Sequence, residues 1–194
     1  MLKIAIVGNI ASGKSTVENF LREKEFSVFD TDILSHEILE NSAEKVKKLF
    51  ENFDILENGE ISRKKLGNLV FFDENLRKKL ENVIYPKLKE KISEIFTENS
   101  DKKFVFISIP LLFEVGWFDL FDKILFIKAD DKIRLERLMK RNNLSKKEAQ
   151  ARIDAQIPQE EKENNADFII CNNEDVQSLQ KQLEAFIIQI EDTE

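Results

Sequence analysis

The stretch IVGNIASGKSTVENF, residues 6–20, decides the fold of this chain. An apolar run rich in Ile and Val, Leu2 to Val7, leads into it and is typical of a strand buried on both faces of a sheet. A helical pattern, Ser15 to Glu23, follows. The short loop between them carries two glycines and a lysine. The sequence therefore predicts a buried strand that turns sharply into a helix.

The loop matches the phosphate-binding pattern G-x-x-x-x-G-K-[ST], from Gly8 to Ser15. Glycines allow backbone N–H groups to turn inward around phosphate oxygens, and the helix N-terminus favours the same anion. Lys14 is placed to reach the β- and γ-phosphates, and the Ser15 hydroxyl to bind Mg²⁺. We therefore expect ATP and Mg²⁺ at the loop residues Gly8, Asn9, Ile10, Ala11, Ser12, Gly13, Lys14, Ser15 and Thr16.

Composition limits the other functions that the chain could have. Its 194 residues are 42% hydrophobic, which suits one core with a modest insertion, and the net charge of −7 argues against a broad nucleic-acid surface. The single cysteine, Cys171, excludes an intramolecular disulfide and is expected to be buried. No apolar run reaches the roughly 20 residues that span a bilayer. The sequence thus predicts a soluble, cytoplasmic protein that binds neither nucleic acid nor membrane.

The remaining pattern alternates between strands and helices. A second short strand is predicted at 26–29, and a charged helical region at 130–163 is a candidate lid over the phosphates. A closing helix at about 175–190 is expected to dock on the core rather than to form a dimer interface. Such alternation favours a parallel α/β sheet with helices on both faces. The other predicted strands are 103–109, 123–128 and 167–171.

Residues 31–100 differ from the rest because they read as helices only, at 34–40, 43–50, 63–70 and 74–96. Asn58-Gly59 indicates a turn, and Pro86 is expected to end or kink its helix near Ile84 or Tyr85. We interpret this block as an insertion between the second and third strands. The predicted organisation is a nucleotide-binding core, 1–30 and 101–194, with an inserted domain, 31–100.

Two carboxylates follow the second predicted strand, Asp30 and Asp32. In an extended segment residues i and i+2 point the same way, so both would face the cleft at the carboxyl ends of the strands. A carboxylate there can accept the proton of an acceptor hydroxyl, and Asp32 is favoured over Asp30; alternatively, one of them caps the next helix. His36, one turn beyond Asp32, is expected in a supporting or solvent-exposed role. The GTPase motifs N-K-x-D and D-x-x-G are absent.

Three arginines, Arg134, Arg137 and Arg141, share one face of a predicted lid helix. Guanidinium groups suit phosphate oxygens because each presents a planar fork of donors. A solvated basic face is the alternative. Beside a phosphate loop and an aspartate pair, we favour phosphate binding by Arg137 and Arg141.

Taken together, these segments resemble the dephospho-CoA kinase family over almost the whole chain. The segments are GNIASGKST, DTD, NGEISRKKLGNLVF, IPLLFE, RLMKRNNLSKKEAQARIDAQ and CNNE. Asn9 and Ala11 depart from the family, in which glycine is common at both positions. Tyr85-Pro86 stands where the family often has His-Pro. The resemblance implies a three-layer kinase fold with a five-stranded parallel sheet, an inserted helical acceptor domain and a lid.

The resemblance also implies the reaction: ATP-dependent phosphorylation of the ribose 3′-hydroxyl of dephospho-CoA, the final step of coenzyme A biosynthesis. Its site residues in this chain would be catalytic Asp32, Lys14, Arg137 and Arg141, acceptor-binding Asp30, Asp32, Arg63, Tyr85, Pro110 and Leu111, and Asn172 and Asn173 near the adenine. We expect a monomer or a weak homo-oligomer. Another small P-loop kinase, for a nucleotide or a sugar, is the alternative, and an ATP-binding regulatory module is the non-enzyme alternative.

Overall fold

A computed structural model describes residues 1–192 of the chain. They form two compact units. The first combines Met1–Asp30 with the chain from Asn99 onward, and the second is Thr31–Glu98. Within residues 1–192, no helix is both long enough and apolar enough to cross a membrane.

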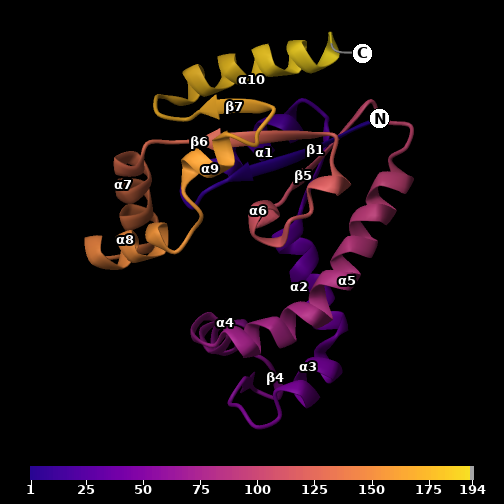
Figure 1. Cartoon of the computed structure of the whole chain (residues 1–194), viewed down its shortest axis with the longest axis vertical. Helices are drawn as coiled ribbons and strands as arrows, with labels where there is room; N and C mark the ends of the chain where they lie inside the picture. The colour runs from indigo at the N-terminus through magenta and orange to yellow at the C-terminus, as the bar shows by residue number, and fades with distance from the viewer. Residues whose placement is uncertain (193–194) are drawn as a thin grey trace. The chain divides into compact units, whose positions relative to one another are not determined.

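A five-stranded sheet forms the centre of the first unit (Figure 1). All its pairings are parallel, and the strand order is β2-β5-β1-β6-β7. The prediction of a parallel α/β sheet is therefore confirmed. The strands are β1 (Leu2–Gly8), β2 (Ser27–Asp30), β5 (Phe104–Ser108), β6 (Lys123–Lys128) and β7 (Phe168–Cys171).

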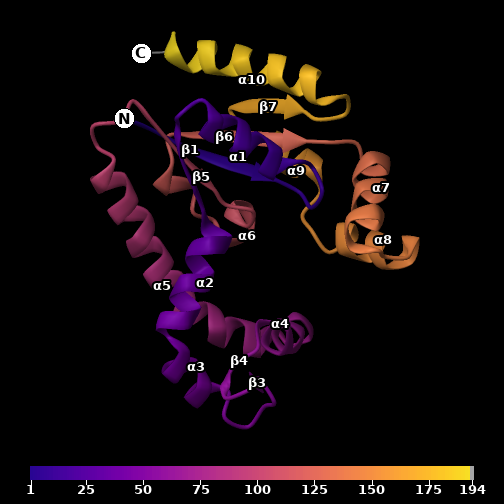
Figure 2. The same cartoon turned by 180° about the vertical axis from the view of Figure 1, so that it is seen from behind.

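Both faces of the central strands are buried, which explains their nearly continuous apolar sequences. Helices α1 (Lys14–Glu23) and α10 (Val176–Glu191) cover one face, where they share a core with alternate residues of the strands. Figure 2 shows α10 alongside β7. The closing helix thus docks on the core, as expected. The core cluster comprises Ile4, Ile6, Val17, Phe20, Leu21, Phe104, Phe106, Leu125, Ile127, Ile170, Leu179, Leu183, Phe186 and Ile190.

The predicted charged helical region, 130–163, contains three helices. Helices α7 (Asp131–Asn142) and α8 (Lys146–Asp154) pack on each other beyond the strand ends (Figure 1), with a capping box at Ser145 and Glu148 between them. Helix α9 (Gln159–Glu163) is held to the core instead. Its fully buried Lys162 donates a 2.9 Å hydrogen bond to Glu114 Oε1 of α6 (Leu112–Val115). A short 3₁₀ helix, Phe118–Leu120, precedes β6.

The second unit has its own core. It contains α2 (Thr31–Asn41), α3 (Ala43–Leu49), α4 (Arg63–Phe72) and α5 (Glu74–Glu98), together with a hairpin of β3 (Leu56–Glu57) and β4 (Glu60–Ile61). The predicted turn is present: Asn58 and Gly59 both have positive φ, as a tight hairpin turn requires. One core cluster of this unit comprises the buried residues Val46, Phe50, Ile55, Leu66, Leu76 and Val83.

Of the two outcomes expected at Pro86, an end or a kink of the helix, the end is wrong. Helix α5 continues through Pro86, because buried side chains on both sides, such as Ile84 and Leu88, hold the two halves in place. A further local expectation was wrong. Cys171 is exposed rather than buried. It lies on the edge strand β7, where Ile170 faces the core and its neighbours face outward.

Candidate functional site

The predicted phosphate loop connects β1 to α1 and has the shape of an anion cradle. Gly13 has φ +97° at the N-cap of α1, and Ala11 has φ +62°. A Cβ on Gly8 would lie 2.5 Å from Ser12 Oγ and 3.0 Å from the carbonyl oxygen of Ile127, so a larger residue there would force the Ser12 side chain to move and would press against β6. The backbone N–H groups of Ala11 and Gly13 have no hydrogen-bond partner within the described part of the chain. These N–H groups, with those of the first turn of α1, can bind an anion.

Lys14 lies in a small polar cluster. Its ammonium donates a 2.8 Å hydrogen bond to Glu18 Oε1 and another to Ser108 Oγ, and Ser108 in turn donates to Glu18 Oε1 at 2.7 Å. Glu18 and Ser108 are both buried. An ammonium has three N–H donors, so one is left for a bound phosphate. Sequence reasoning missed both partners; the helical i, i+4 spacing of Lys14 and Glu18 is the one signal that could have found Glu18.

The predicted adenine-side residues follow β7 and contact neighbouring loops. Asn172 Nδ2 donates to the carbonyl oxygen of Ser12 at 2.8 Å, which ties β7 to the phosphate loop. Asn173 forms a reciprocal pair with Asp130: Asn173 Nδ2 donates to Asp130 Oδ1, and the Asp130 N–H donates to Asn173 Oδ1, both at 2.8 Å. Thr16, the last loop residue, donates its N–H to the carbonyl of Gly13 at 3.0 Å. Asn172 thus adjoins the loop, and Asn173 adjoins the start of α7.

The two aspartates do not lie in one extended segment, contrary to the expectation from their spacing. Asp30 ends β2 in the first unit, and α2 begins at Thr31, so Asp32 lies in the first helical turn of the second unit. The i, i+2 argument fails because the backbone changes from strand to helix between them. Asp30 is half-buried and Asp32 is exposed.

The three arginines of α7 lie in different environments. Arg134 is buried and donates to the carbonyl oxygen of Ile10 and to Asp131. Arg137 is half-buried, and its Nη1 is buried without a partner among residues 1–192. Arg141 is exposed and donates to Asn142 Oδ1 at 2.9 Å. The structure therefore separates a fully buried arginine at the loop from a half-buried one and an exposed one. Sequence reasoning missed the contact of Arg134 with the loop, which no pattern signals.

In the second unit, the predicted residue Tyr85 lines a cavity, and the predicted residue Arg63 contacts His36, which also lines it. The cavity has a volume of about 260 Å³ and an apolar lining of Leu39, Leu80 and Ile84. Its polar lining residues are Ser35, His36, Arg77, Glu81 and Tyr85.

Hydrogen bonds connect the rim of this cavity. Arg63 Nη1 lies 3.0 Å from Nδ1 of His36, and the Tyr85 hydroxyl donates to Glu81 Oε1 at 3.1 Å. His36 thus lies between Arg63 and the cavity that it lines. Elsewhere, in the first unit, the predicted residues Pro110 and Leu111 form the turn between β5 and α6, where Leu111 is exposed.

A phosphate loop at the centre of a parallel sheet, with a lysine in the cradle and arginines on a helix beyond the strand ends, defines a P-loop kinase. Comparisons with known proteins agree. The family model for dephospho-CoA kinase matches residues 2–178. This chain belongs to the dephospho-CoA kinase family, which carries out the final step of coenzyme A biosynthesis with ATP as co-substrate.

Individual relatives extend the match over nearly the whole chain. A dephospho-CoA kinase of Bacillus thuringiensis subsp. konkukian is 39% identical over 190 residues, which cover 95% of this chain and 94% of the relative. The crystal structure of TT1252 from Thermus thermophilus matches with a TM-score of 0.85 and 37% identity, and covers 97% of each chain. A dephospho-CoA kinase from Campylobacter jejuni matches with a TM-score of 0.76 and 34% identity, over 97% of this chain and 96% of that one.

Proposed function

We propose that this chain transfers the γ-phosphoryl group of ATP to the ribose 3′-hydroxyl of dephospho-CoA through the residues described above. One observation carries the proposal. The ammonium of Lys14 is held in place by Glu18 and Ser108 beside loop N–H groups that have no partner within residues 1–192. An arrangement of this kind binds the phosphates of a nucleoside triphosphate.

Residues of the loop position the donor nucleotide. The N–H groups of Ala11 and Gly13 and the third donor of Lys14 bind the β- and γ-phosphates. Asn172 keeps the loop closed through its bond to Ser12, and with Asn173 it forms the adenine side of the site. Because these groups are already ordered, binding requires little rearrangement of the loop.

The residues present fit a Mg²⁺ ion bound together with ATP. Ser15 lies exposed in the first turn of α1, next to the cradle, and offers a hydroxyl oxygen, the type of ligand that Mg²⁺ prefers. When bound, the ion offsets charge on the β- and γ-phosphates.

Asp32 accepts the proton of the 3′-hydroxyl, or orients that hydroxyl, during transfer. Its exposed carboxylate in the first turn of α2 is accessible to a substrate. Asp30, at the end of β2, is half-buried and assists in binding the acceptor. Arg137 and Arg141 offset the charge that develops on the transferred phosphoryl group. Arg137 suits this role because its buried Nη1 donor has no partner among the described residues.

The cavity of the second unit receives part of the acceptor. Its apolar floor suits the uncharged portion of dephospho-CoA, and Arg63 and Arg77 supply cations for the phosphates of the acceptor. Tyr85 takes part through its ring and its hydroxyl, which is already bonded to Glu81. Pro110 and Leu111 complete the acceptor contacts. On this proposal residues 31–100 form the acceptor domain, residues 1–30 and 101–194 the nucleotide-binding core, and residues 130–163 the lid.

An acceptor panel tests the proposal. The purified protein is incubated with Mg²⁺-ATP and dephospho-CoA, nucleoside monophosphates, sugars or no acceptor, and ADP is measured. We expect rapid ADP formation with dephospho-CoA and release of CoA. Phosphorylation of a nucleotide or a sugar instead would favour another small kinase, and no ADP with any acceptor would favour a regulatory module. We also expect a monomer, or a weak homo-oligomer, in the cytoplasm.

A further inference from the structure

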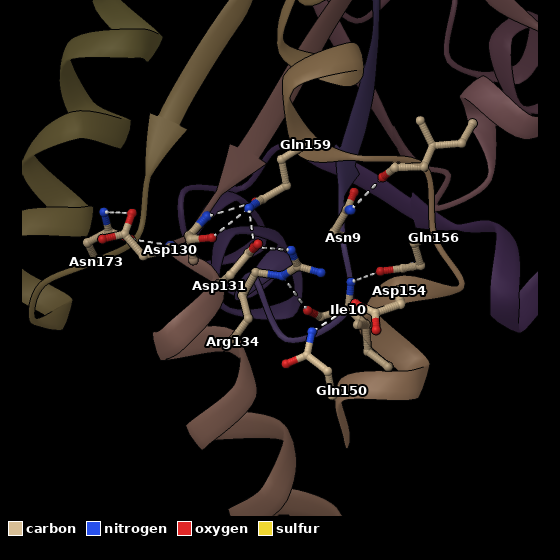
Figure 3. Close-up of polar contacts among 12 residues, drawn as sticks. Asn9, Ile10, Asp130, Asp131, Arg134, Gln150, Asp154, Gln156, Gln159 and Asn173 are labelled. Atoms are coloured by element: carbon tan, nitrogen blue, oxygen red, sulfur yellow. Dashed lines mark hydrogen bonds and ion pairs between the residues drawn. The ribbon is translucent and has the colours of Figure 1, made fainter. Parts of the chain in front are cut away.

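At the apex of the phosphate loop, Asn9-Ile10-Ala11, hydrogen bonds join Asn9 and Ile10 to the first turn of α7 and to the residues just after α8 (Figure 3). At the entrance to the pair, Arg134 Nε donates to the carbonyl oxygen of Ile10 at 3.0 Å. At the exit, the N–H of Ile10 donates to Gln156 Oε1 at 2.7 Å. Both backbone groups of Ile10 are therefore fixed by side chains more than a hundred residues away in the chain.

The same contact region continues on either side of Ile10. Asn9 Nδ2 donates to the carbonyl of Ile157 at 2.9 Å. Ile10 and Ala11 pack against the small apolar core of the helical pair, in which Leu138, Ala149 and Ile153 are buried. The loop apex and the helical pair are thus joined by hydrogen bonds as well as by apolar contact.

Arg134 is held in turn by a second set of bonds. Its Nη1 donates to Asp131 Oδ1 at 2.7 Å, and Gln159 Nε2 donates to the same oxygen at 2.9 Å. Gln159 also donates to the carbonyl of Ala129, just past β6, at 2.9 Å (Figure 3). This chain of bonds fixes the guanidinium of Arg134 relative to the central sheet.

A buried arginine is costly. Arg134 is 2% exposed, and its one carboxylate partner among the described residues, Asp131, is itself largely exposed. Burial lowers the pKa of the Arg134 guanidinium, and Asp131 opposes that shift. Nη2 of Arg134 has no partner within residues 1–192. An apolar side chain would fill the same space without this cost, so the arginine must contribute something other than packing.

The loop contains a strain that explains what Arg134 contributes. Ala11 has φ +62°, in the left-handed region, which is unfavourable for a residue with a Cβ. Such a conformation persists when the surrounding structure holds it in place. Arg134 and Gln156 hold Ile10, the residue immediately before Ala11, on both sides.

We propose that Arg134 is a positioning residue that, with Gln156, holds the apex of the phosphate loop in its anion-binding shape against the strain at Ala11. The nucleotide then meets a preformed cradle. Without this support, only a fraction of the molecules would have the anion-binding loop shape, and the apparent nucleotide affinity would fall in proportion to that fraction. The inference rests on the proposed function only in that the loop binds the phosphates of ATP.

The test is a double-mutant cycle between Arg134→Met and Ala11→Gly, with Mg²⁺-ADP affinity measured by calorimetry. Methionine keeps the packing but removes the charged hydrogen bond to the loop, so we expect affinity to fall about tenfold. Glycine adopts the left-handed conformation without a steric cost. Ala11→Gly should therefore restore about fivefold of the loss in the Arg134→Met background, and its effect on affinity should be larger there than in the wild-type background.

Controls separate this effect from misfolding and from loss of charge. Lys132→Gln removes a positive charge from the exposed side of the same helix and should leave Mg²⁺-ADP affinity unchanged. If Arg134→Met does not fold, as judged by its thermal unfolding, Gln156→Leu serves instead. It removes the acceptor of the Ile10 N–H from a half-buried site and should likewise weaken binding and be rescued by Ala11→Gly.

The inference would be overturned by wild-type affinity in a folded Arg134→Met protein. It would equally be overturned if Ala11→Gly had the same effect on affinity in both backgrounds. Turnover supplies a second readout: the KM for ATP should rise more than kcat falls. Mg²⁺-ADP binding needs no acceptor. A protein that binds nucleotide but does not phosphorylate dephospho-CoA would therefore contradict the proposed function, while the positioning role of Arg134 would still be tested by the binding measurements.

Discussion

The side chain of Asn172 occupies the space that a Cβ on Gly13 would need, and its Nδ2 donates to the carbonyl oxygen of the preceding residue, Ser12. The strand end at β7 and the phosphate loop are therefore fitted to each other. Two independent features require glycine at position 13. Its φ of +97° lies in the left-handed region, and the side chain of Asn172 leaves no room for a Cβ.

Gly13→Ala should weaken Mg²⁺-ATP binding by at least about tenfold, because the new methyl group opposes the left-handed backbone and displaces Asn172. Calorimetric titration with Mg²⁺-ADP measures the loss. Gly67→Ala is the matched control. Gly67 lies within α4, and a Cβ there would meet nothing within 4 Å. That variant should raise the free energy of unfolding by roughly 0.5–1 kcal/mol. Unchanged nucleotide affinity in Gly13→Ala would contradict the requirement for glycine beside Asn172.

Asp32→Asn should lower kcat by about 10²- to 10⁴-fold, because the amide cannot accept the proton of the 3′-hydroxyl. ATP affinity should stay nearly intact, since Asp32 is not part of the phosphate loop. Steady-state kinetics and nucleotide titration measure the two quantities. Asp30→Asn is the comparison, and its main effect should be on the KM for dephospho-CoA. Near-normal turnover in Asp32→Asn would remove Asp32 from the mechanism.

Glu18→Gln should tighten Mg²⁺-ADP binding and slow turnover. The variant removes the buried negative charge of Glu18 beside the cradle. That charge repels the phosphates of the nucleotide, and it also holds the ammonium of Lys14 in place. We expect a gain in affinity of about tenfold and a fall in kcat, because Lys14 loses its fixed orientation. Glu23→Gln makes the same charge change at the exposed end of α1 and should alter neither quantity. Weaker ADP binding in Glu18→Gln would show that Glu18 assists the cradle directly.

Arg63→Gln should raise the KM for dephospho-CoA by about tenfold while leaving the KM for ATP unchanged, because a charge-assisted contact to an acceptor phosphate is lost. The neighbouring Lys64→Gln controls for the loss of charge at an exposed position. Initial-rate kinetics with one substrate varied at a time separate the two constants. An equal rise in both KM values would argue for a general structural role of Arg63.

Asp175 should make the stability of the chain depend on acid pH. It caps α10 by accepting a 2.8 Å hydrogen bond from the Ser178 N–H, and this bond lowers the pKa of its carboxyl. A lowered pKa means that the stabilisation is complete above the ordinary aspartate range and is lost as the pH falls through the folded-state value.

Asp175→Ala should therefore lower the melting temperature at neutral pH, and the difference from wild type should shrink on acidification. Asp175→Asn keeps an uncharged cap and should be less destabilised near neutrality. Thermal unfolding followed by circular dichroism between pH 7 and pH 3 measures both. A constant difference between Asp175→Ala and wild type across this range would rule out the linkage.

Features with a strong local signal could be predicted from the sequence. The phosphate loop, the five parallel strands and the helical block follow from periodicity, glycine spacing and turn residues, because those patterns reflect local backbone geometry. The Asn58-Gly59 turn is an example in which the residue type requires the conformation.

Features that depend on tertiary contacts could not be predicted. Arg134 lies on the same helix face as Arg137 in the sequence pattern, yet only Arg134 is fully buried, because the loop apex packs over it. Asp30 and Asp32 lie at a change from strand to helix that their spacing does not reveal. The exposure of Cys171 follows from the position of β7 at the sheet edge, which only the strand order shows.

The strand order also has a consequence for co-translational folding. The central strand β1 is synthesised first, but it pairs only with β5 and β6, which begin at Phe104 and Lys123. The helical unit, Thr31–Glu98, is contiguous and is complete before either partner emerges. Because local contacts form sooner than distant ones, we expect this inserted unit to fold first, while β1 awaits its partners. Assembly of the catalytic sheet is thus postponed until β5 and β6 have been synthesised.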